Sequence, residues 1–230
     1  MMSRNRFISL GGDCQPAHNL LRLTAARMPM FFDCIGTPLR SIVPLIESRF
    51  EDAFEPDALT WKRGDPWTVT DERYGLEAPH LFRECGDGHV RARVRAIRKS
   101  GEAFLNAILD PDPIVFVRRW YPAVDVGTCD DDNDEVQDAL TAIHPRCIFL
   151  RLRDFAVGAP VIRGNILTCF NPPTAPPWTG DDALYERNFT MADRLASELF
   201  GSVSCPRGPV ADYWNARGTT ARSNGSVISW

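Results

Sequence analysis

Cys14 is the residue of this sequence whose position best suits covalent chemistry. It ends the segment SLGGDC, whose first two residues close the short apolar run FISL at residues 7–10. Pro16, two residues after Cys14, opens a predicted helix. Backbone N–H groups and the dipole at a helix N-terminus lower a thiol pKa and can bind an oxyanion. We therefore predict that Cys14 is a nucleophile and that the backbone at Gly12, Asp13 and Gln15 forms the oxyanion hole. A buried apolar filler is the alternative for Cys14.

A thiol nucleophile needs a base, and the chain has 4 histidines. His18 lies one helical turn beyond Cys14, but we expect Cys14 to precede the helix, which weakens this pairing. His144 is predicted at a helix C-terminus, where the dipole favours an imidazolium, and His89 opens a basic helix. His80, in EAPHLF, lies in an unassigned segment after a proline, and by elimination it is the predicted base.

Asp33 is the predicted third member of the site, the acid that would fix the histidine tautomer. It lies in the segment MPMFFDCIGTP, where apolar residues surround it, and a buried carboxylate needs a partner. A capping role in the turn before Pro38 is the competing interpretation. Asp13 is the local alternative for the acid, although a turn or capping role explains Asp13 most simply.

Arg118 and Arg119 end the apolar run IVFVRR. Ligands of open parallel sheets lie beyond the carboxyl ends of the strands, so these arginines are predicted to bind an anionic group of the substrate. Ion pairs with nearby acids are the alternative.

The elements that must position these residues follow an alternating pattern. Strands are predicted at 7–10, 114–118, 147–152 and 165–170, and helices from Pro16, at about 38–50, at 89–109, from about 134 to 143 and at about 181–200. The strands are almost continuously apolar, as in parallel sheets that helices cover. The predicted fold is a three-layer α/β fold with a mainly parallel sheet and helices on both faces.

The chain is predicted to form a single domain over residues 1–230. Residues 51–88 mix prolines, glycines, tryptophans and charges, and they are expected to form an ordered excursion over the sheet edge. The stretch from about 202 to 230 is expected to be an irregular tail.

The composition limits the classes of partner and ligand that we expect for this protein. A net charge of -4 gives no reason to expect nucleic acid, and no stretch suits a signal peptide or a membrane span, so a cytoplasmic protein is expected. The 7 cysteines show no CxxC pair, and the acidic run DDDNDE lacks the calcium-loop spacing. We expect no cofactor and no metal, a small-molecule or peptide substrate, and no membrane partner.

The segments SLGGDC, MPMFFDCIGT, APHLF and IVFVRR together resemble a bacterial family of unknown function labelled as papain-like cysteine peptidases. The resemblance covers roughly the first two thirds of the chain. It implies a nucleophile at Cys14, a histidine at His80 and Asp33 in the accompanying motif. Cys34 stands where the family tends to have tryptophan, and Leu81 replaces the acid that follows the histidine.

The opening FISLGGDC is also similar to the start of the SGNH hydrolases, although their later D-x-x-H signature is absent. The predicted activity is that of a cysteine-dependent hydrolase or acyltransferase on an amide, ester or thioester. The alternative is a noncatalytic or glycosyltransferase-like protein that binds a sugar or an anion, with Trp61, Trp67 and Trp120 lining a pocket and Cys14 merely packing.

Overall fold

The computed structural model describes residues 6–12, 14–23, 30–62, 68–79, 81–82, 86–120, 130–154, 158–171 and 182–201. At its centre is a 5-stranded sheet in the order β1-β5-β6-β8-β7. Its strands are β1 (Arg6–Ser9), β5 (Ile114–Arg119), β6 (Cys147–Asp154), β8 (Ile166–Asn171) and β7 (Val161–Arg163). Neighbouring strands are parallel except at the edge, where β7 pairs antiparallel with β8. The predicted, mainly parallel α/β sheet is confirmed.

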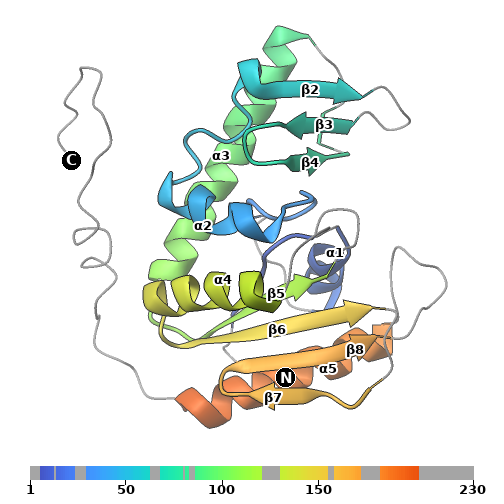
Figure 1. Ribbon diagram of the computed structural model, residues 1–230, viewed down its shortest axis with the longest axis vertical. Helices are drawn as coiled ribbons and strands as arrows, with labels where there is room; N and C mark the ends of the chain where they lie inside the picture. Colours follow the sequence, from blue (N-terminus) through green and yellow to red (C-terminus); the bar gives the residue numbers. More distant parts are fainter. Residues whose placement is uncertain are drawn as a thin grey trace.

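Helices cover both faces of this sheet (Figure 1). The elements α1 (Cys14–Leu23) and α5 (Asp182–Phe200) pack on one face, against side chains such as Val115 and Val117. The elements α2 (Leu39–Glu47), α3 (Asp87–Leu109) and α4 (Asp130–Ile143) cover the other face, where Phe116 is buried. Successive strand residues point to opposite faces, so one apolar run supplies both cores.

A second, smaller sheet lies within residues 51–88. The short helix η1 (Pro56–Ala58) leads into β2 (Leu59–Lys62), which pairs antiparallel with β3 (Thr68–Asp71), and β3 pairs with β4 (Leu76–Ala78). In Figure 1 the long helix α3 runs from beside this sheet down to the main sheet. Val69 and Phe82 belong to the same buried cluster as the α2 and α3 residues, so the small sheet shares the core on that face.

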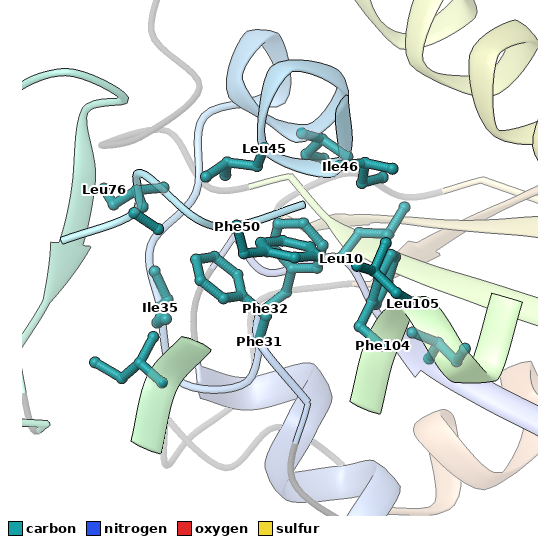
Figure 2. Close-up of a cluster of buried hydrophobic side chains, with 14 of the residues drawn as sticks. Leu10, Phe31, Phe32, Ile35, Leu45, Ile46, Phe50, Leu76, Phe104 and Leu105 are labelled. Atoms are coloured by element: carbon teal, nitrogen blue, oxygen red, sulfur yellow. The ribbon is translucent and has the colours of Figure 1, made fainter. Parts of the chain in front are cut away.

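Aromatic rings fill the centre of that core. Figure 2 shows Phe31, Phe32, Phe50 and Phe104 close together, with Leu10 from the end of β1 beside them. The ring centroids of Phe31 and Phe50 are 4.3 Å apart, and those of Phe32 and Phe104 are 5.1 Å apart in an edge-to-face contact. These contacts anchor the segment directly before Asp33.

Several predicted boundaries need correction. The helix expected to begin after Cys14 includes Cys14 as its first residue. The helix expected to reach Phe50 ends at Glu47, because Arg49 and Phe50 take positive φ values of 55° and 61°. This turn directs the Phe50 ring into the core against Gly101 of α3, where an added Cβ would lie 2.7 Å from the ring.

Two further regions bear on the predictions. Strand β7 was missed because it has only 3 residues, all exposed, and therefore carries no buried apolar run. The tail expected from about residue 202 lies outside the described residues. Within the part of the chain that the structure describes, no helix has the length and apolar character to cross a membrane.

Candidate functional site

The turn between β1 and α1 is shaped by two glycines. Gly11 and Gly12 have φ values of 78° and 98°, a region that side chains other than glycine rarely occupy. A Cβ on Gly12 would lie 2.4 Å from the carbonyl oxygen of Arg119. The turn therefore lies directly against the end of β5. It leads into α1, whose first residue is Cys14.

The loop that carries Asp33 packs against this turn. A Cβ on Gly11 would lie 3.0 Å from the carbonyl oxygen of Ile35. The carboxylate of Asp33 accepts a hydrogen bond of 2.9 Å from the N–H of Met30, and the N–H of Asp33 donates to the Met30 carbonyl at 3.0 Å. The Asp33 carboxylate thus stabilises its own turn through the N–H of the residue three positions before it. It is half-buried beside the buried Phe31 and Phe32 rather than enclosed by them.

The thiol of Cys14 meets the same loop. Its side chain is hydrogen-bonded to Cys34, and this bond is the largest of the causes that raise the pKa of the Cys14 thiol far above its ordinary value. Burial raises it further, and so do the negative charges of an ionised Cys34 and of Asp33. Cys14 is therefore a protonated thiol near neutral pH, and it has Cys34 and Asp33 as neighbours.

This result corrects one expectation from the sequence. The helix N-terminus was expected to lower the pKa of Cys14, whereas the structure gives it a raised pKa because of Cys34, burial and Asp33. Cys34 had not been predicted as a site residue. Its place directly after Asp33 in the motif was the signal that could have found it.

The position of Cys14 in α1 makes His18 a better candidate for the base than the sequence indicated. Because Cys14 belongs to α1, the two residues stand in the i, i+4 relation on one helix, where Cβ atoms lie about 5–6 Å apart. His18 is half-buried. The argument that Cys14 precedes the helix no longer weakens this pairing, so His18 is a second candidate for the base.

His80 lies outside the described residues, but the strand that precedes it, β4, pairs with the Asp33 loop. Glu77 of β4 and Gly36 exchange two backbone hydrogen bonds, at 2.7 and 2.8 Å. Phe82, two residues beyond His80, is 1% exposed and packs on the Phe54 ring at 5.8 Å between centroids. The fold thus joins three segments that the sequence singled out.

The two arginines at the end of β5 lie beside the same turn. Arg118 is 5% exposed, and its Nη1 donates a hydrogen bond of 2.8 Å to the carbonyl oxygen of Leu10. Its guanidinium carbon lies 3.6 Å from the position that a Cβ on Gly12 would take. Arg119 is 9% exposed. The bond from Arg118 to Leu10 ties the guanidinium to the backbone of the turn.

The predicted oxyanion-hole residues are only partly described. Gly12 and Gln15 flank Cys14 in the turn and in the first turn of α1, whereas Asp13 lies outside the described residues. N–H groups in the first turn of a helix have no carbonyl partner within it, and Pro16 has no N–H. The Gln15 side chain is buried and accepts a 2.7 Å hydrogen bond from Tyr185 of α5, which fixes the start of α1 on the neighbouring helix.

His144 follows α4, and its environment is structural, as predicted. Its ring is buried, with Nδ1 3.1 Å from the carbonyl oxygen of Ile108. The expected imidazolium is wrong, because burial lowers the pKa of His144 below its ordinary value.

The described cysteines other than the pair at the turn are core residues. Burial raises the pKa of both Cys147 and Cys169 to about 11. The four cysteines that the structure describes form no disulfide. No cluster of three metal-binding side chains occurs among the described residues.

The tryptophans named in the binding-protein alternative have different surroundings where the structure describes them. Trp61 of β2 packs edge-to-face on Phe82 at 5.7 Å, whereas Trp120 is exposed just after β5. Trp67 lies outside the described residues.

These features define an α/β protein with a cysteine at the turn between its first strand and first helix. The model of the family described as "Putative papain-like cysteine peptidase" matches residues 5–145. The chain belongs to this family, which supports a function of the cysteine-hydrolase kind and confirms the resemblance seen in the motifs. Comparison with curated proteins and with solved structures gave no match.

Proposed function

We propose that this protein is a cysteine-dependent hydrolase or acyltransferase that acts on an amide, ester or thioester carbonyl through Cys14. The observation that carries the proposal is the contact between the Cys14 thiol and the loop of Asp33 and Cys34. It joins the two family segments that hold the expected nucleophile and the expected acid.

The raised pKa of Cys14 determines the form of the first step. A thiol, rather than a preformed thiolate, must lose its proton as its sulfur attacks the carbonyl carbon, so the reaction needs a general base in contact with Cys14. We propose His80 as that base and Asp33 as the residue that orients it. The imidazolium that forms would offset the negative charge of Asp33 beside the sulfur.

The remaining steps follow from proton balance. The imidazolium returns its proton to the leaving amine, alcohol or thiol, and an acyl group remains on Cys14 as a thioester. Water then releases the acyl group in a hydrolase, and another nucleophile does so in an acyltransferase. Backbone N–H groups at Gly12, Asp13 and Gln15 would hold the oxyanion, with Arg118 or Arg119 binding an anionic part of the substrate.

The test is acylation of the full chain by p-nitrophenyl acetate, followed by the mass of the intact protein and of its peptides. We expect one acetyl group on Cys14, and none there in Cys14→Ala. His80→Ala should slow the acylation by at least about 100-fold, which is the low end of general-base effects. His89→Ala removes a histidine of α3 and serves as the matched control with an unchanged rate.

The outcomes separate the candidate residues. If His18→Ala slows acylation and His80→Ala does not, the base is His18, and the assignment of His80 fails. If Cys14 remains unmodified while other cysteines react, Cys14 is a packing residue, and a noncatalytic or glycosyltransferase-like protein that binds a sugar or an anion becomes the better description.

A further inference from the structure

The alternation in CIFLRLRD places polar side chains on one face of β6. Phe149, Arg151 and Arg153 are two residues apart, so all three point to the face that α4 covers, where Phe149 is buried. The register between neighbouring strands extends this face from β6 over β8 to the edge strand β7. Arg151 pairs with Thr168, which pairs with Val161, and the next position along β6 on the same face, Arg153, pairs with Phe170.

Helix α4 packs on the first part of this face. Val136, Leu140 and Ile143 pack in the cluster that contains Phe149, and the polar residues at the start of α4 meet Arg151. Arg151 Nη2 donates to Asp134 at 2.9 Å and to Gln137 at 3.3 Å, and the Arg151 side chain is 14% exposed. These bonds hold the guanidinium at the edge of the helix.

Beyond Arg151 the same face forms a pocket of about 250 Å³. The described residues that line it are Asp134, Arg151, Arg153, Val161, Arg163, Ile166, Thr168 and Phe170. Arg163 comes from β7 and pairs with Ile166 of β8, so the guanidinium groups reach the pocket from both sides of β8. Strands lie about 4.8 Å apart, which leaves two long arginine side chains within reach of one small anion above Thr168.

The described lining of the pocket is rich in arginine. Three guanidinium groups meet a single carboxylate, that of Asp134, among the lining residues that the structure describes, whereas the whole chain carries -4. Arginine binds phosphate and carboxylate through paired N–H donors. Several guanidinium groups around one small pocket can bind the oxygens of a single phosphate group together.

We propose that this pocket binds a phosphate monoester, with its phosphate between Arg151, Arg153 and Arg163 and its organic part on Phe170. A phosphate monoester is close to a dianion at neutral pH. The volume is below that of sites for drug-sized ligands, so it accepts the phosphate and a small attached group only. Phe170 offers the apolar wall, and its ring is backed by Gly158, where a Cβ would lie 3.1 Å from it.

The pocket is separate from the cysteine site. Strands β5, β6 and β8 follow β1 in the sheet, so β8 lies about 14 Å from β1. Binding here does not depend on the proposed catalytic role of Cys14, and the Cys14→Ala variant should bind the same ligand with unchanged affinity.

Calorimetric titration of the full chain with phenyl phosphate and with inorganic phosphate, at constant ionic strength, tests this proposal. We expect a dissociation constant for phenyl phosphate of about 1 mM or below. Arg163→Gln should weaken it at least about tenfold, because charge-assisted hydrogen bonds are lost at an exposed position that the fold tolerates. Arg194→Gln, which removes an exposed arginine of α5 paired with Glu198, is the matched control and should bind as the wild type does.

Phe170→Leu tests the organic part of the ligand. It should weaken phenyl phosphate by about three- to tenfold, and it should leave inorganic phosphate unchanged. The proposal is overturned if neither phosphate binds at about 10 mM. It is also overturned if Arg163→Gln and Arg194→Gln reduce binding equally, or if Phe170→Leu does not distinguish the two ligands.

Discussion

Replacement of Gly12 by alanine tests how the nucleophile is positioned. The new Cβ would lie 2.4 Å from the Arg119 carbonyl oxygen, more than 0.5 Å inside the 3.0 Å that real Cβ contacts respect, and a backbone oxygen cannot rotate away as a side chain can. The φ of 98° adds a second penalty, because alanine rarely takes such a conformation. The strand end or the turn has to move.

The magnitude follows from these two costs. A residue in a disfavoured backbone region costs about 1–3 kcal/mol, and an overpacked contact costs about 1–3 kcal/mol more. We therefore expect the free energy of unfolding to fall by about 2–6 kcal/mol, a large part of the total of about 5–15 kcal/mol of a typical protein. The melting temperature should fall by at least about 5 °C for a chain of this size.

The assay is urea unfolding followed by circular dichroism, with Gly88→Ala as the matched control. Gly88 lies in the first turns of α3 with nothing within 4 Å of an added Cβ, so alanine there should leave stability unchanged or raise it by up to about 1 kcal/mol. If Gly12→Ala unfolds within about 1 kcal/mol of the wild type, the close approach of the turn to β5 is refuted.

Three further changes probe the site and its surroundings. Cys34→Ala removes the largest cause of the raised pKa of Cys14, so iodoacetamide should modify Cys14 at least about tenfold faster at about pH 8; an unchanged rate, read by peptide mass, contradicts the thiol contact. The pKa of His144 is lower in the folded protein than its unfolded value of 6.5, so the unfolded state binds more protons just below pH 6.5. The contribution of His144 to stability is therefore complete above pH 6.5, and it declines as the pH falls toward the folded pKa. The loss of unfolding free energy between about pH 7.5 and 5 should therefore be smaller in His144→Gln, and an equal loss in both proteins counts against this account. Arg118→Met deletes the bond to the Leu10 carbonyl and should lower the unfolding free energy by about 1–3 kcal/mol in the same urea assay, whereas a neutral effect would mean that this bond adds nothing.

The candidate site shows which features a local sequence motif can predict and which it cannot. The residues SLGGDC predicted a nucleophile at a strand-to-helix turn, and the turn is there. The pattern did not predict that Cys14 is the first residue of α1, because the start of a helix depends on how the preceding loop packs, here against Arg119 of β5. Because α1 begins two residues before the predicted start at Pro16, His18 returns as a candidate base.

The sequence by itself determined the central sheet and most of its helices. Continuous apolar runs such as Ile114–Arg119 have to be buried on both faces, and only a helix-covered parallel sheet provides that environment. The stop of the last helix at Phe200, just before Gly201, was likewise readable from local sequence.

Only the tertiary structure decided the charge states and the groupings of side chains. The pKa of Cys14 depends on Cys34, which a distant loop brings to it, and the pKa of His144 depends on its burial near Ile108. The pocket of Arg151 and Arg163 arises from strand register between β6, β8 and β7. Helix dipoles and apolar periodicity act within a few residues, whereas burial, register and charge contacts join segments that the sequence keeps far apart.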